Sequence, residues 1–167
     1  MNGDHLIECI RIIPGLSHEF GGIFLNSNIP PKLKKSKNLF FIVNTIKDPI
    51  MEKIGHWVLF YIKDYKLYFF DSYGITPDWY GGDIAEIYYN HQFPSECVIK
   101  HELQQDSSFV CGIYCLFFCQ KMYKNCPIKT IKNYFGCNKK NNDSLMMKYF
   151  YNIMGINFEK FIAKTKV

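Results

Sequence analysis

Apolar and aromatic residues gather in short runs along the first part of the chain, and their spacing predicts strands. Residues 39–43 form an uninterrupted apolar run, which predicts a short buried strand that ends at Asn44. Residues 56–62 and 66–70 are rich in aromatic and β-branched side chains, and the connection at residues 63–65 has the length of a turn. These two runs therefore predict an antiparallel hairpin.

Helical spacing of apolar residues dominates the rest of the pattern. The first twelve or so residues predict a helix that stops at Pro14. Residues 76–90 also indicate a helix, with Pro77 at an allowed first-turn position and with Gly81 and Gly82 delaying its start. The remaining elements are predicted as a strand at residues 97–100, helices at residues 111–123, 127–134 and 142–154, and turns at residues 20–22 and 26–31. A few strands followed mostly by helices indicate an α+β fold, in which a small, mostly antiparallel sheet packs on a buried central helix and further helices surround it.

The composition indicates one folded domain that spans residues 1–167. Apolar residues make up 48% of the chain and aromatic residues 17%, which is well above the content of disordered proteins. No apolar run approaches the ~20 residues of a membrane span, and the first residues lack the regions of a signal peptide. We therefore expect a soluble, intracellular, monomeric protein that does not contact a membrane.

Charge and cysteine content bear on whether the chain binds polyanions or metals and whether it forms disulfides. The net charge is +5, with lysines clustered at Lys32, Lys34, Lys35 and Lys37 and again at Lys139 and Lys140. Each cluster could be a solvated surface or a patch that binds a polyanion such as DNA. The seven cysteines are not spaced as a disulfide framework or as zinc knuckles, so no metal site is predicted. Cys115 and Cys119 share a helical stripe with Cys111 and are predicted to be small buried apolar residues.

Cys111 opens the apolar run that predicts the central helix. The first turn of a helix presents unpaired N–H groups and a partial positive charge, which favour a thiolate over a thiol. The same N–H groups can stabilise the oxyanion that forms when a thiolate attacks a carbonyl group. Cys111 is therefore the candidate nucleophile, and the central helix is expected to carry it.

A candidate base and a candidate carboxylate lie at the two ends of the predicted hairpin. His56 begins its first strand and Asp71 ends its second, and these ends are neighbours in an antiparallel pair. Counted back from the turn, the two residues come within about one residue of facing each other, so Asp71 could orient His56. Asp71 could also cap the turn at residues 72–74, a common role for Asp. Of the other histidines, only His101 competes with His56 as a base.

The order of these residues resembles the adenovirus-type (adenain-like) cysteine proteases, and more distantly the SUMO-deconjugating proteases of the same clan. Gly-His-Trp surrounds His56, and Cys-Gly begins at Cys111. Between them, Leu-Gln ending at Gln104 and a serine at Ser108 look like the version carried by virophages and polinton-type elements. The likeness continues in the same order through Phe-Gly-Gly-Ile-Phe at residues 20–24, Pro-Pro at residues 30–31 and Ile-Val-Asn-Thr at residues 42–45. It spans roughly residues 20–124.

The resemblance implies a role for each matching residue. His56, Asp71 and Cys111 would form the catalytic triad, although the adenovirus enzymes carry Glu where this chain has Asp71. The side chain of Gln104 would help to hold the oxyanion, at the spacing of the adenovirus type. Gln105 is the alternative, because it has the spacing of the SUMO proteases. A disulfide to an activating viral peptide is the role implied for Cys97, in the context Pro-Ser-Glu-Cys.

The function implied by the resemblance is that of a viral cysteine endopeptidase. It would cleave capsid or core precursors during particle maturation, in the host nucleus or a cytoplasmic virus factory, and could be packaged in the virion. No cofactor is required by the sequence, although a viral peptide and DNA are activators in that family. Two alternatives stay open. One is a SUMO- or ubiquitin-type isopeptidase of the same clan, and the other is a nucleic-acid-binding protein without enzymatic activity.

Overall fold

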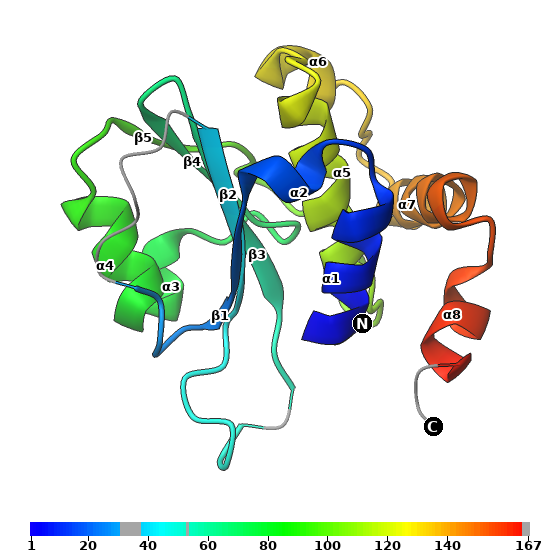
Figure 1. The fold of residues 1–167 in the computed structure, drawn as a ribbon, viewed down its shortest axis with the longest axis horizontal. Coiled ribbons are helices and arrows are strands. Elements are labelled where there is room, and N and C mark those ends of the chain that lie inside the picture. Colours follow the sequence, from blue (N-terminus) through cyan, green and yellow to red (C-terminus); the bar gives the residue numbers. More distant parts are fainter. Residues whose placement is uncertain (31–37, 53, 165–167) are drawn as a thin grey trace.

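A five-stranded sheet runs through the middle of the molecule (Figure 1). The structure is a computed structural model that describes residues 1–30, 38–52 and 54–164. The strands lie side by side in chain order as β1 (Phe20–Leu25), β2 (Asn38–Asn44), β3 (Trp57–Lys63), β4 (Lys66–Phe70) and β5 (Ser95–Cys97). The three central strands are antiparallel, whereas each edge strand is parallel to its neighbour. The predicted α+β class with a mostly antiparallel sheet is confirmed.

The hairpin of β3 and β4 turns on two residues. Asp64 and Tyr65 both have positive φ angles, 48° and 60°, and Lys63 pairs with Lys66 across the turn. A turn with two such residues follows the right-handed twist of the strands. The predicted hairpin is therefore confirmed, although β3 begins one residue later than expected and leaves His56 in the preceding loop.

Helices cover both faces of the sheet. They are α1 (Gly3–Ile12), α2 (Leu16–Glu19), α3 (Pro77–Tyr80), α4 (Gly82–Asn90), α5 (Cys111–Tyr123), α6 (Ile128–Lys132), α7 (Lys139–Met154) and α8 (Phe158–Lys164). In Figure 1, α3 and α4 lie on one side of the sheet and the other helices on the opposite side. Phe40 and Ile42 belong to the core that contains α5, whereas Phe41 and Val43 pack in a second core with Ile84 of α4. Because both faces are covered, the strands are apolar without strict alternation.

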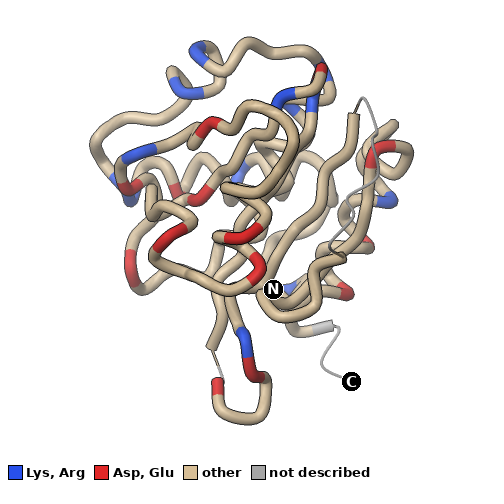
Figure 2. Tube along the Cα trace, turned by 90° about the vertical axis from the view of Figure 1, so that its left-hand side faces the viewer, with Lys and Arg blue, Asp and Glu red and all other residues tan. Residues whose placement is uncertain are grey.

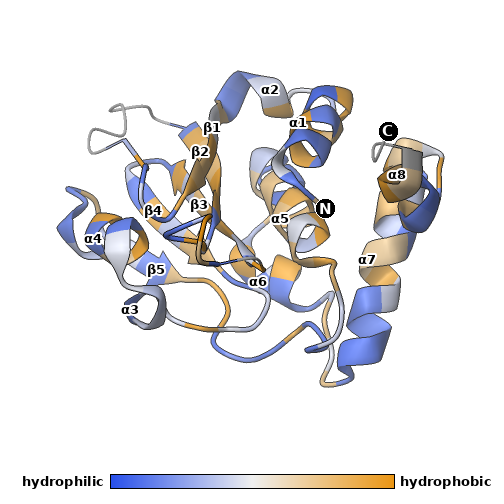
Figure 3. Ribbon diagram, turned by 90° about the horizontal axis from the view of Figure 1, so that it is seen from below, coloured by the Kyte–Doolittle hydropathy of each residue, from blue (hydrophilic) through white to orange (hydrophobic). Residues whose placement is uncertain are grey.

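The central helix α5 is buried along most of its length. Figure 3 shows it as a largely apolar helix enclosed between the sheet and the outer helices α1 and α7. Its observed bounds, Cys111–Tyr123, are those predicted from the sequence. Cys115 and Cys119 are fully buried, which confirms that they are small apolar core residues.

The turn predicted at residues 20–22 is wrong, because these residues begin β1. Phe20 pairs with Phe40, and the register of the strand shifts between Phe20 and Gly22. Gly22 has a φ of 139°, a backbone conformation that side chains other than glycine's rarely adopt. The glycines therefore mark an irregularity within a strand and not the end of one.

Several other predicted bounds are also wrong. The third predicted strand lies earlier, as β5, and pairs in parallel with β4 through Cys97 and its two preceding residues. The helix predicted at residues 76–90 is interrupted at Gly81, where φ is 56°. The helix predicted at residues 127–134 is shorter at both ends. Helix α7 begins three residues before the prediction, because the Asn138 side chain accepts a hydrogen bond from the Asn141 N–H and caps it.

Charged residues of both signs are interspersed along the described chain (Figure 2). Lys32, Lys34, Lys35 and Lys37 lie outside the described residues. Lys139 forms ion pairs with Glu102 and Asp106. Within residues 1–30, 38–52 and 54–164, no helix is both long and apolar enough to cross a membrane.

Candidate active site

His56 is held between two segments at the start of the hairpin. Its backbone N–H donates to Thr45 Oγ1 at 3.0 Å. Its ring Nε2 donates to Asp71 Oδ1 at 2.7 Å. The side chain is only 13% exposed. The structure thus brings together the predicted base and the predicted carboxylate and fixes the orientation of the imidazole.

The register of the hairpin differs from the sequence prediction. Leu59 pairs with Phe70, so one further step along the same register places residue 58 opposite Asp71. His56 therefore lies two residues from the facing position, and the predicted offset of about one residue is wrong. Side chains two residues apart on a strand point to the same face, which is why the contact still forms.

Asp71 is buried and accepts three hydrogen bonds. Besides His56, its Oδ1 accepts from the Tyr73 N–H at 2.7 Å, and its Oδ2 accepts from the Tyr80 hydroxyl at 2.5 Å. The bond to Tyr73 belongs to the turn after β4, so Asp71 both caps that turn and contacts His56. Tyr80 comes from α3 and was not expected from the sequence, because nothing in the spacing of a short helix marks a partner for Asp71. The three contacts satisfy the buried carboxylate and fix its position beside His56.

Cys111 is the first residue of α5, and its thiol is paired with His56. Burial disfavours the charged imidazole, but hydrogen bonds to Asp71 and Cys111 outweigh burial and raise the pKa of His56 to about 9. Burial likewise disfavours the thiolate, yet the hydrogen bond and charge of His56 prevail and lower the pKa of Cys111. Because Nε2 is occupied by Asp71, Nδ1 is the ring nitrogen left for the thiol. The arrangement favours a thiolate–imidazolium pair over a neutral thiol and imidazole.

At four other cysteines, burial prevails and raises the pKa of the thiol. Burial raises the pKa of Cys9 to about 12. It also raises the pKa of Cys115 and Cys119 well above the ordinary range, and that of Cys97 to a smaller extent. These thiols therefore favour the neutral form, in contrast to Cys111.

The amino-terminal end of α5 leaves a backbone N–H group without an acceptor among the described residues. No side chain caps the helix. The N–H groups of Ile113 and Tyr114 both donate to the Val110 carbonyl group. Among the described residues, no carbonyl group accepts a hydrogen bond from the Cys111 N–H, so this donor is available to a ligand next to the thiol.

Gln104 and Gln105 point to different parts of the molecule. Gln104 is fully buried, and its Oε1 accepts from Ser72 Oγ at 2.7 Å. Its Nε2 therefore faces the other way and donates to the Ser108 carbonyl group at 2.8 Å. Gln105 Nε2 instead donates to Asp143 Oδ2 of α7 at 3.2 Å. Gln104 lies beside the turn that follows Asp71, whereas Gln105 connects this segment to α7.

The remaining candidates lie apart from this cluster. His101 is exposed, and no side-chain contact joins it to Cys111 among the described residues. Cys97 lies at the end of edge strand β5, half-buried, with its Sγ 3.4 Å from the Tyr88 hydroxyl. No three His, Cys, Asp or Glu side chains within the described parts of the chain gather as a metal site would require.

Comparisons with known proteins show a partial likeness among solved structures. No protein-family model matches the chain, and no curated protein matches it. Among solved structures, the crystal structure of the Se-Met ASFV pS273R protease is similar, with 19% sequence identity and a TM-score of 0.40. The match covers 57% of this chain and 38% of that one.

Proposed function

We propose that the protein is a cysteine endopeptidase with Cys111 as nucleophile, His56 as general base and acid, and Asp71 as the residue that orients His56. The observation that carries the proposal is the position of His56. Its imidazole lies between a buried carboxylate and the first thiol of α5, and this contact lowers the pKa of that thiol despite its burial. Structural cysteines elsewhere in the core have raised pKa values.

The proposed reaction has two stages. The Cys111 thiolate attacks the peptide carbonyl carbon, a C–S bond forms, and an electron pair of the C=O bond moves to oxygen. The Cys111 N–H and Gln104 Nε2 are the proposed donors to that oxygen. As the C–N bond breaks, His56 gives its proton to the leaving amine. Water then attacks the thioester with His56 as base, and the carboxylic acid product leaves as the thiol is restored.

The proposed substrates are capsid or core precursors of a DNA virus or virus-like element. Support comes from the ordered resemblance of the sequence to the adenovirus-type enzymes, which includes the residues around His56, Gln104 and Cys111. The nuclear, virus-factory or virion location follows from the same resemblance. Activation by a peptide joined to Cys97, or by DNA, is a further proposal of this kind, and Cys97 lies on an edge strand of the sheet.

Hydrolysis of a peptide panel tests the proposal. The panel contains Gly-containing peptides from viral precursors together with SUMO and ubiquitin fusions, and each is assayed with and without DNA. We expect Cys111→Ala to lower kcat/KM by at least about a thousandfold, because it removes the nucleophile. The matched control is Cys137→Ala, which removes an exposed thiol outside the site and should leave hydrolysis unchanged.

Two outcomes would redirect this assignment. Wild-type hydrolysis by Cys111→Ala would contradict the mechanism. Cleavage of the SUMO or ubiquitin fusions alone would move the chain to the isopeptidase branch of the clan.

A further inference from the structure

We propose that the hydroxyl group of Tyr73 is a third donor to the oxyanion, beside Gln104 Nε2 and the Cys111 N–H. The inference rests on the proposed function, because it concerns the same reaction at the same thiol. No motif in the sequence marks Tyr73, which lies in the turn between β4 and α3. Its place in the structure suggests the role.

The turn that carries Tyr73 is fixed to the segment that carries Gln104. The N–H groups of Leu103 and Gln104 both donate to the Ser72 carbonyl group, at 2.8 and 3.2 Å. Gly74 has a φ of 68°, and a Cβ there would lie 2.5 Å from the backbone nitrogen of His101. The two backbones are therefore in close contact, and this contact holds the Tyr73 side chain in place relative to Gln104.

The Tyr73 side chain lies between the base and the amide. Its ring centroid is 4.6 Å from that of His56, and its hydroxyl oxygen is 3.3 Å from Gln104 Nε2. Ordinary hydrogen bonds are about 2.7 to 3.0 Å long, so two donors separated by this distance can both reach one oxygen atom. The hydroxyl oxygen of Tyr73 thus lies next to the place where a substrate oxygen would meet Gln104.

The amide and the hydroxyl also have protons to donate. Ser72 Oγ bonds to Gln104 Oε1, and one proton of Gln104 Nε2 goes to the Ser108 carbonyl group. The second proton faces Tyr73 through a long contact. Within the described chain, no acceptor takes the proton of the Tyr73 hydroxyl. Without substrate, the tyrosine oxygen accepts from Gln104; with substrate, both groups can donate to the oxyanion.

Tyr73 would act by hydrogen bonding alone. Burial, followed by the negative charge of the Cys111 thiolate, raises the pKa of Tyr73 to about 12, so the phenol keeps its proton at neutral pH. When the thiolate adds to the carbonyl group, the negative charge moves from sulfur to oxygen and no proton leaves Tyr73. A donor that meets charge only in this state increases kcat more than substrate affinity.

The test is the variant Tyr73→Phe, which keeps the ring against His56 and removes only the hydroxyl group. We expect kcat to fall about 10- to 100-fold with KM changed less than about threefold, since Gln104 and the Cys111 N–H remain. Alkylation of Cys111 by iodoacetamide forms no oxyanion, so its rate should stay within about twofold of wild type. The control is Tyr65→Phe, which removes a hydroxyl group from the exposed β3–β4 turn.

Each alternative result has a distinct meaning. An unchanged or increased kcat in Tyr73→Phe, with hydrolysis that still depends on Cys111, would overturn the role of Tyr73 and leave the proposed function standing. Equal losses of alkylation and hydrolysis would also overturn it, because Tyr73 would then act on the thiolate and not on the oxyanion. Absence of Cys111-dependent hydrolysis in the wild type would overturn both proposals.

Discussion

At the scale of single residues, burial and hydrogen bonding act in opposite directions on the charged forms of the site. Burial alone would leave both Cys111 and His56 neutral. The carboxylate of Asp71 reverses this for His56, and the positive imidazole then reverses it for Cys111. The Tyr80 hydroxyl group and the Tyr73 N–H in turn donate hydrogen bonds to Asp71 and hold it in place. The state of the Cys111 thiol therefore depends on a series of contacts that runs from Tyr80 through Asp71 and His56 to the sulfur.

The pH dependence of kcat/KM follows from these pKa shifts. The active pair needs Cys111 deprotonated and His56 protonated. Since the pKa of Cys111 is lowered, activity should rise on the acid side below the ordinary range of a thiol. Since the pKa of His56 is raised to about 9, activity should persist through neutral pH and fall as the pH passes about 9. Because the two groups are coupled, the measured limbs belong to the pair.

The variant Asp71→Asn provides the control for this profile. It keeps the shape of the side chain and removes the charge, so the alkaline limb should move to lower pH. An alkaline limb that stays in place in Asp71→Asn would show that Asp71 does not hold the proton on His56. Rates measured from pH 5 to 10 at constant ionic strength give both limbs.

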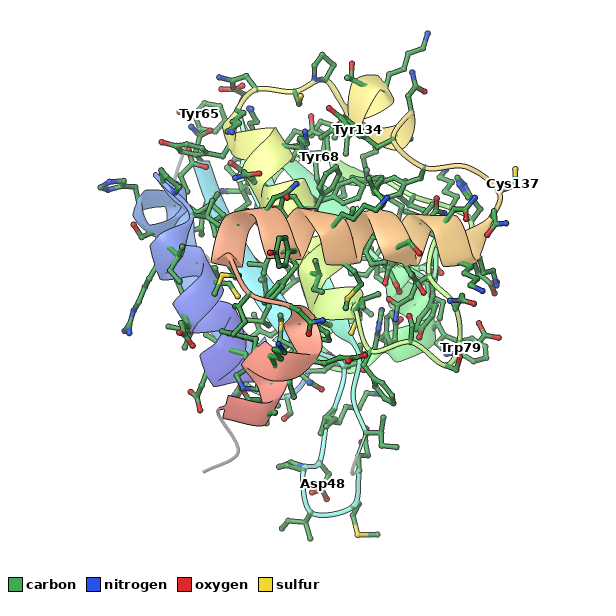
Figure 4. The ribbon with its side chains drawn as sticks, turned by 90° about the vertical axis from the view of Figure 1, so that its right-hand side faces the viewer. Asp48, Tyr65, Tyr68, Trp79, Tyr134 and Cys137 are labelled. Carbon is green, nitrogen blue, oxygen red and sulfur yellow. The ribbon has the colours of Figure 1, made fainter. Side chains whose placement is uncertain are left out.

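At the scale of elements, the segment between β5 and α5 is held from two sides. On one side, the Ser72 carbonyl group accepts hydrogen bonds from backbone N–H groups of this segment, and the Ser72 hydroxyl group orients the Gln104 amide. From the other side, α7 lies across α5, as Figure 4 shows. Its Asn142 Nδ2 donates to the Leu103 carbonyl group at 3.1 Å, and its Asp143 accepts from Gln105. Helix α7 therefore supports the segment that carries Gln104, the proposed oxyanion donor.

This arrangement separates the roles of the two glutamines. Gln104→Ala should lower kcat roughly 10- to 1000-fold with a modest change in KM, as expected for the loss of one oxyanion donor. Gln105→Ala should change kcat far less and instead lower the free energy of unfolding by about 1 kcal/mol, since it removes the contact with Asp143. Steady-state kinetics and urea denaturation of both variants make the comparison. A larger kcat loss in Gln105→Ala would move the oxyanion role to that residue.

The helices and strands that were predicted correctly are those whose position depends on a local pattern of residues. The bounds of α5 and the β3–β4 hairpin follow from apolar runs and a tight turn. Strand β1 was missed because two glycines usually indicate a turn, whereas here pairing with β2 determines the conformation. Gln104 and Gln105 could not be separated by spacing alone, because the direction of each side chain depends on Ser72 and Asp143, which are distant in sequence.

At the scale of the whole molecule, the site lies where segments from different parts of the chain meet around the amino-terminal end of α5. The loop before β3 supplies His56, the turn after β4 supplies Asp71, and α5 supplies Cys111. The segment that leads into α1 adds support, because the Met1 carbonyl group accepts a hydrogen bond from the indole of Trp57, the residue after His56. The loop between β2 and β3, with Asp48 labelled in Figure 4, extends away from the body of the molecule. Tyr73 and Tyr80 join the site only through this folding, so the sequence alone did not predict them.

The most direct test of the catalytic centre is selective alkylation of the seven cysteines by limiting iodoacetamide at pH 6, read out by mass spectrometry. At this pH an ordinary thiol is about 0.3% thiolate, so exposure alone gives slow labelling. We predict that Cys111 is labelled first despite its burial, and that His56→Ala slows its labelling at least about tenfold while leaving exposed Cys137 unaffected. Faster labelling of Cys137 or Cys97 than of Cys111, or equal labelling of Cys111 in His56→Ala, would contradict the account.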